Sequence, residues 1–291
     1  MRDKRKLSLS RKKLAYSSPF SLLFLTACGG SGQDNNDNTG STVIGSGVSE
    51  TFSGFVVKGP LSNATVFADY DGDGIKGDNE PSVLTNEDGS YSLSASNNFS
   101  SIVVSTNSNT IDSSSGAVLD GVTLKAPKGS GVVSPTSTMV VESNLSVEEV
   151  ATALGLPEGF SLDFNPFASD ADPEMAKAVE KTSQMVMSTV NAITASGEGV
   201  GLSKVDAFKT AMEAVVDVVK TNATEKTTVD FADSAVLDEI QTKAIKVAVE
   251  KGASETAMKK TLQKAIETTK TVNLDIKNLD DVFSAGAKKI F

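Results

Sequence analysis

Five acidic residues fall within the twelve positions from Asp69 to Glu80. Carboxylates occupy the first, third, fifth and twelfth positions, at Asp69, Asp71, Asp73 and Glu80, and a glycine occupies the sixth. This is the spacing of a calcium-binding loop, since calcium takes about six to eight oxygen ligands at flexible geometry. We expect each aspartate to supply one carboxylate oxygen and Glu80 to supply both.

The remaining residues of the loop complete the predicted site. Ile75 would supply a backbone carbonyl, Asp78 is a further candidate ligand, and Gly74 permits the positive φ that lets the chain wrap round an ion. Without a cation the acids repel one another against only one basic residue of the loop, Lys76. The loop is therefore expected to favour bound calcium; the alternative is an acidic hairpin turn that binds no ion tightly.

The surrounding sequence differs from that of an EF-hand. Residues 64–68 have the composition of a strand, and Pro81 directly after the loop disfavours a helix at Glu80. The stretch 59–93 instead resembles the calcium-binding B-type repeats of Gram-positive surface adhesins and their Gram-negative relatives. The second part of that motif matches residues 85–91, with Asn86 in place of the usual aspartate. The resemblance covers about residues 53–95 and implies a prealbumin-like β-sandwich.

The only cysteine of the chain, Cys28, ends the run Leu25-Thr26-Ala27-Cys28. Seven basic residues and then an apolar stretch over 14–27 precede it, an order typical of a secretory signal. The stretch is too short for a permanent membrane span, which needs roughly 20 apolar residues. The alternative is an ordinary cleaved signal that happens to end near a cysteine.

This run resembles the lipobox of bacterial lipoproteins. The resemblance implies that residues 1–27 are removed and that Cys28 carries fatty acyl chains such as palmitate, several of which anchor a protein more firmly than one. Gly29 follows the cysteine, where an aspartate is associated with retention in the inner membrane. The predicted location is the cell envelope, on the periplasmic or surface face of the outer membrane.

Composition excludes several classes of activity. The chain has no histidine, which excludes Ser-His-Asp and Cys-His catalysis and the common zinc sites. Residues 1–27 hold seven basic residues and one acidic residue, so that their removal takes the formal charge from −10 to −16. Such a surface repels phosphate backbones, and we expect no nucleic-acid partner.

The pattern along the chain changes from strand to helix. Residues 28–50 are rich in Gly, Ser and Asn and predict a flexible tether. Over 51–134, short β-branched and aromatic runs alternate with turn signals, which predicts an antiparallel β-sandwich. Strands are expected over 52–58, 64–68, 91–93, 101–105 and 118–124.

The spacing of apolar residues over 135–291 predicts a helical domain packed as a bundle. Helix starts are expected at Ser146, Asp172 and Ser203, whose side chains are good caps. An apolar stripe from Val205 to Val219 should follow the third start. Further helical segments are expected over 235–251, 254–272 and 279–291. The chain is therefore predicted to be a segregated α+β protein, with a β-sandwich followed by a helical bundle.

These features favour a non-enzymatic module for binding, adhesion or scaffolding, attached to a membrane by its lipid and contacting a surface protein or polymer. Two alternatives stay open: a carboxylate-dependent hydrolase of surface polymers, and a structural subunit of a larger envelope assembly. The chain has no tryptophan and three tyrosines, whereas sugar-binding clefts usually stack rings on aromatic side chains. No acidic pair lies in an apolar sequence setting that would suit a hydrolase.

Overall fold

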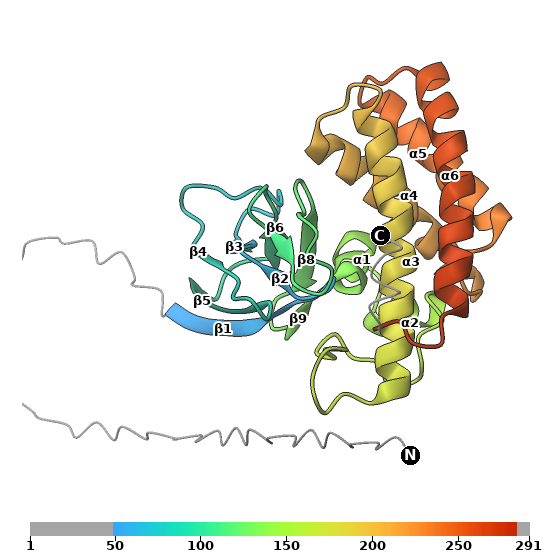
Figure 1. Cartoon of the computed structure of the whole chain (residues 1–291). Helices are drawn as coiled ribbons and strands as arrows, with labels where there is room; N and C mark the ends of the chain where they lie inside the picture. Colours follow the sequence, from blue (N-terminus) through green and yellow to red (C-terminus); the bar gives the residue numbers. More distant parts are fainter. Residues whose placement is uncertain (1–48, 284–291) are drawn as a thin grey trace, which may run out of the picture. The chain divides into compact units, whose positions relative to one another are not determined.

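The computed structural model describes residues 49–283, in which nine strands precede six helices (Figure 1). This order confirms the predicted segregated α+β class, with sheets in the first part and helices in the second. Three predicted features lie wholly or largely outside the described residues: the signal segment, the tether with Cys28, and most of the segment 279–291.

The strands form two larger sheets and one short pair. The three-stranded sheet has the order β5-β1-β9, with β1 antiparallel to β5 and parallel to β9. The four-stranded sheet has the order β4-β3-β6-β8 and is antiparallel throughout. The strands are β1 (Ser49–Val56), β2 (Leu61–Ser62), β3 (Thr65–Asp69), β4 (Ser82–Leu84), β5 (Ser90–Ser96), β6 (Ser101–Ser105), β7 (Ile111–Asp112), β8 (Thr123–Pro127) and β9 (Val132–Val133). The remaining pair is β2 with β7.

Alternation along the strands builds the core between the two larger sheets. In β5, Tyr91, Leu93 and Ala95 are buried while the serines between them are exposed, the period of two that a half-buried strand requires. These side chains belong to the same hydrophobic cluster as Val66 of β3 and Val104 of β6. Apolar burial of this kind is the main force that holds the sheets together.

One predicted strand is misplaced. The sequence predicts a strand over 118–124, but the structure begins β8 only at Thr123. Gly121 has a φ of 81°, a left-handed conformation that interrupts extended backbone, and the Val118 side chain is 60% exposed. The apolar residues before Gly121 therefore lie in a loop that carries the chain to β8.

The helices begin where their capping residues predict. Ser146, Asp172 and Ser203 each accept a hydrogen bond from the backbone amide three residues ahead, which satisfies a free helix donor. The helices are α1 (Pro135–Ser143), α2 (Val147–Ala153), α3 (Pro173–Glu198), α4 (Lys204–Glu225), α5 (Ser234–Glu250) and α6 (Glu255–Asn278).

Two details of the predicted bundle are wrong. Val205 is exposed in the first turn of α4, whereas the stripe from Phe208 to Val219 is buried as expected. Helix α6 continues to Asn278, beyond the predicted end at residue 272. Asn273 lies in this extension, and its buried amide donates to Thr189 Oγ1 and to the Phe231 carbonyl. A polar residue of this kind is not apparent as a core position in the sequence pattern.

The sheets and helices are joined through α1. This helix packs along β8, and the Ser137 and Thr138 hydroxyls contact the Lys125 carbonyl of that strand. The hydrophobic cluster runs on from the sandwich into the helices, and the described residues 49–283 belong to one compact unit. Among the described residues, no helix has the length and apolar character needed to cross a membrane.

Candidate calcium loop

The predicted calcium loop connects two paired strands. Asp69 is the last residue of β3, and the chain returns as β4 from Ser82, which pairs with Phe67. The flanking strands hold both ends of the loop at the edge of the four-stranded sheet. As expected from residues 64–68 and Pro81, neither end of the loop carries a helix.

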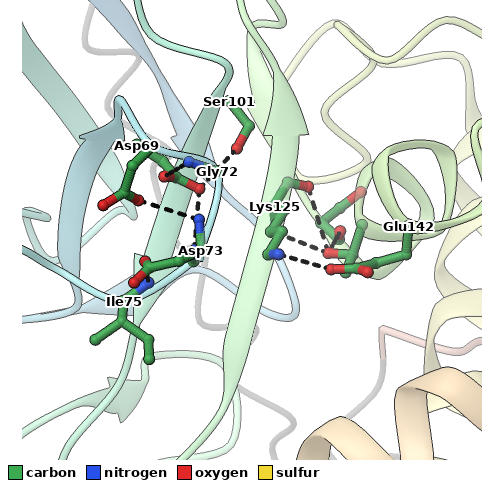
Figure 2. A network of polar contacts seen from close by, with 11 residues as sticks. Asp69, Gly72, Asp73, Ile75, Ser101, Lys125 and Glu142 are labelled. Carbon is green, nitrogen blue, oxygen red and sulfur yellow. Dashed lines mark hydrogen bonds and ion pairs between the residues drawn. The ribbon is translucent and has the colours of Figure 1, made fainter.

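Asp69 is buried beneath the first half of the loop and binds its backbone amides. Its side chain is 1% exposed, and its two oxygens accept hydrogen bonds from the amides of Gly72 at 2.7 Å and Gly74 at 3.1 Å (Figure 2). The Ser101 hydroxyl of β6 also donates to it, at 3.4 Å. Burial raises the pKa of Asp69, and the two amide donors offset part of that rise.

Glu80 ties the end of the loop to its beginning. Its side chain is 7% exposed, and one oxygen accepts the Tyr70 amide while the other accepts the Gly77 amide, both at 2.8 Å. Each oxygen of a carboxylate has more than one lone pair, so these bonds leave acceptor capacity. Glu80 therefore has a structural task that is independent of any ion.

The structure brings three of the predicted ligands together. Oxygen atoms of Asp69, Asp71 and Asp73 all lie within 4.8 Å of one another. Asp71 and Asp73 are exposed, and one oxygen of each accepts a backbone amide, from Asp73 at 3.2 Å and Ile75 at 2.6 Å. The second oxygen of each has no hydrogen-bond partner within residues 49–283, which leaves it available to a cation.

The other predicted ligands lie outside this group. The Ile75 side chain is exposed, and its amide is the donor to Asp73. Asp78 is exposed, and neither Asp78 nor Glu80 belongs to the group of three carboxylates. Their roles as ligands, and that of the Ile75 carbonyl, stay predictions.

Gly74 has the positive φ expected of it, at 72°. A second reason for glycine comes from a residue far along the chain: a Cβ at this position would lie 2.9 Å from both Cε and Nζ of Lys125. The Lys125 ammonium thus lies against the loop, and it also pairs with Glu142 of α1 at 2.8 Å (Figure 2). Burial still raises the pKa of Asp69 overall, and the attraction of Lys125 offsets a part of that rise.

The loop is close to a positive charge from outside its own sequence as well as to Lys76. Lys76 is the one basic residue of the loop sequence, and its ammonium donates to the neighbouring Gly77 carbonyl at 3.1 Å. Lys125 is the nearby positive charge that acts on Asp69. Sequence spacing offers no sign of this, because Lys125 reaches the loop only through the pairing of β6 with β8.

The second part of the adhesin-like motif forms the turn before β5. The Thr85 hydroxyl is buried, donates to the Leu61 carbonyl at 2.6 Å and accepts the Ala64 amide at 3.0 Å. Asn86 bonds to Ser90 through both its backbone and its side chain. These contacts attach the turn to β2, to the residue before β3 and to the start of β5.

The structure contains a buried charged cluster between sheet and helix that the sequence pattern does not predict. Lys58, Asp112 of β7 and Glu180 of α3 line a cavity of about 30 Å³, which has room for about one water molecule. The Lys58 ammonium lies 3.9 Å from Asp112, and Gln184 donates to Glu180 at 2.8 Å. Burial raises the pKa of Glu180 to about 7 and lowers that of Lys58.

No family model, curated protein or solved structure matches the chain. The likeness to adhesin repeats and to lipoproteins therefore rests on residues 59–93 and on the run that ends at Cys28.

Proposed function

We propose that this chain is a lipid-anchored, non-enzymatic protein of the bacterial cell envelope. Calcium stabilises its β-sandwich, and the protein presents a contact surface to a surface protein or polymer. The observation that supports the calcium part is the gathering of Asp69, Asp71 and Asp73 oxygens within 4.8 Å of one another.

The chemistry of these donors suits a hard cation. Carboxylate oxygens are the ligands that calcium prefers, and its flexible coordination tolerates a loop that supplies them at uneven spacing. Asp69 and Glu80 already hold the backbone, so that Asp71 and Asp73 need little rearrangement to present their second oxygens. A bound ion would also relieve the repulsion among the three charges.

Thermal unfolding of the full chain in calcium and in chelator tests this proposal. We expect the melting temperature to rise with calcium, because an ion that binds only the folded state adds about 2.7 kcal/mol at a roughly hundredfold excess over its dissociation constant. Asp71→Asn combined with Asp73→Asn should abolish the response and leave the melt in chelator unchanged or slightly higher, since both side chains are exposed and their mutual repulsion is removed.

Asp78→Asn is the matched control, because Asp78 is an exposed acid of the same loop outside the group of three. It should keep the calcium response. Asp69 and Glu80 are poor positions for this test, since their loss would unfold the loop with or without an ion. Equal melts in calcium and chelator would contradict the calcium proposal, whereas loss of the response in Asp78→Asn would add Asp78 to the ligands.

One observation favours a hydrolase as the second candidate. Glu180 is 5% exposed and has its pKa raised to about 7, a property typical of general acids. It also borders a more open hollow of about 440 Å³. Turnover on a panel of glycans that is lost in Glu180→Gln would establish this alternative, whereas the absence of turnover would support the non-enzymatic proposal.

A further inference from the structure

An open groove lies beside the end of β1, next to Gly131 and the start of β5. It has a volume of about 920 Å³ and is lined by residues 53–55, the turn and start of β5, Gly131 and residues 163–172. We call it the β1 groove. Four aspartates line it, Asp88, Asp163, Asp170 and Asp172, and among the described residues no lysine or arginine does. Its lining also includes Phe55, Tyr91 and Phe164.

The β1 groove exposes an unpaired strand edge. Strand β1 pairs with β5 over 49–55, but on its other side it pairs with β9 only at Phe55 and Val56. The Phe55 amide donates to the Gly131 carbonyl at 2.9 Å, on the β9 side. Because backbone groups alternate in direction along a strand, the amides of Thr51 and Ser53 face the same side. No strand within residues 49–283 pairs with them there.

Tyr91 brings an unpaired hydroxyl to this edge. Its side chain is 4% exposed, yet its hydroxyl has no hydrogen-bond partner within the described part of the chain. Tyr91 also lines the groove, so its hydroxyl is placed to donate to a bound segment. A Cβ on Gly54 would lie 2.9 Å from this hydroxyl and 2.5 Å from the Gly131 carbonyl oxygen. Glycine at position 54 therefore leaves room for the phenol to reach the groove between the two strands.

Backbone amides hold three of the four groove carboxylates in place. Asp163 accepts the Gly131 amide at 2.6 Å, Asp172 accepts the Met175 amide at 2.9 Å, and Asp88 accepts the Ser90 amide at 3.0 Å. In Asp163 and Asp172 this bond uses one oxygen and leaves the other without a hydrogen-bond partner among residues 49–283. The bonds from Ser90 lower the pKa of Asp88, which keeps that group negative at neutral pH.

We propose that the β1 groove binds an extended, lysine- or arginine-rich segment of a partner protein, which adds a strand to the open edge of β1. Strand addition supplies affinity through backbone hydrogen bonds, and the side chains of the added strand supply specificity. Here the basic side chains meet the groove aspartates, and a backbone carbonyl of the segment accepts from Tyr91. A second copy of this chain fits less well, because the chain is acidic and two copies repel.

Fluorescence anisotropy of labelled peptides with the full chain tests this inference. The probe is an eight-residue peptide of alternating lysine and threonine. One comparison peptide carries N-methyl groups on alternate amides, which keeps the charge but prevents strand pairing. The other has glutamate in place of lysine. We expect the first peptide to bind, with an affinity that falls as salt rises, and both comparison peptides to bind at least tenfold more weakly.

Variants of the chain separate strand pairing from charge. Ser53→Pro removes an amide that points to the open edge and leaves the β5 ladder intact, so binding should fall at least tenfold. Tyr91→Phe removes only the hydroxyl and should weaken binding severalfold. Asp170→Asn with Asp172→Asn should also weaken it tenfold, and asparagine at 172 still caps α3. Glu225→Gln with Asp275→Asn makes the same charge change on exposed positions of α4 and α6 and should have little effect.

Three results would overturn the inference. In one, the N-methylated peptide binds as tightly as the first peptide, and in another the groove acid pair and the control acid pair lose the same amount of binding. The third result is a chain that binds no peptide but self-associates, with the self-association abolished by Ser53→Pro. The inference rests on the proposed binding role of the protein but not on calcium. Measuring binding in calcium and in chelator distinguishes the two, because a chain with no calcium response can still bind the peptide through this groove.

Discussion

Asp69 and Glu80 differ from the acids between them in what surrounds their oxygens. Both are buried and accept backbone amides of their own loop, whereas Asp71 and Asp73 are exposed and each keep one oxygen without a described partner. Spacing along the chain assigns all four the same role as ligands. The structure adds a second role for two of them, as the residues that give the loop its shape.

Glu180 is expected to make the folded protein less stable as the pH rises. Its pKa is about 4.5 in the unfolded chain and about 7 in the folded chain, mainly because burial disfavours its charge. Between these values the unfolded state loses a proton that the folded state keeps. Folding therefore becomes less favourable as the pH rises through this window, and the loss is complete above it.

Glu180→Gln removes this titration and keeps an acceptor for Gln184. We expect the free energy of unfolding to rise by up to about 3 kcal/mol at pH 8, and to change little at pH 4, where both states are protonated. Denaturant unfolding at several pH values measures this. Glu174→Gln, an exposed acid at the start of the same helix, should change it by less than about 0.5 kcal/mol throughout. A larger gain at pH 4 than at pH 8 would contradict the assignment.

At the scale of elements, α1 and β8 place a positive charge beside the candidate calcium loop. Lys125 of β8 lies against Gly74 and pairs with Glu142 of α1. Its charge attracts Asp69 when no ion is present and repels a bound cation. Because Glu142 of α1 pairs with Lys125, the helical part of the chain affects the loop through the Lys125 side chain.

Lys125→Met should lower the melting temperature in chelator and widen the difference between calcium and chelator, because a charge that competes with the ion is removed. Thermal melts of this variant measure both effects. Lys128→Met is the control, since Lys128 is exposed on the same segment and contacts the Asn97 carbonyl and the Phe99 ring instead of the loop. A narrower difference in Lys125→Met would show that the lysine supports ion binding.

At the scale of the whole molecule, the sheets and helices share one hydrophobic cluster. We therefore expect them to unfold together. Two spectroscopic signals report on the two parts separately. Tyrosine emission reports on the sandwich, because the chain has no tryptophan and its two described tyrosines, Tyr70 and Tyr91, lie there. Far-ultraviolet circular dichroism reports mainly on the helices. Tyrosine emission and circular dichroism should give coincident denaturant transitions. Separate midpoints would mean that the two parts fold independently.

The proposed anchor also belongs to the whole molecule. Cys28→Ala should release the protein from membranes, because no acyl chains can be attached without the thiol, while the melt of the folded part should stay the same. Fractionation of cells into membrane and soluble portions measures this. Ser41→Ala, a change in the predicted tether, is the control and should remain with the membrane. Membrane association that persists in Cys28→Ala would contradict the lipid anchor.

Local sequence determined much of this protein. Residues only a few positions apart decide the positive φ at Gly74, the caps at Ser146 and Asp172, and the strand over 91–93, and all of these are as predicted. The spacing of the loop aspartates likewise brings their oxygens together within one short turn.

Tertiary structure alone decided which groups are buried and which charges meet. Lys125 reaches the loop through strand pairing, and Lys58 of the turn after β1 meets Asp112 of β7 and Glu180 of α3. The open edge of β1 likewise depends on how short β9 is. Burial, pKa and unpaired edges depend on residues far apart in the chain, and local periodicity carries no information about such distant neighbours.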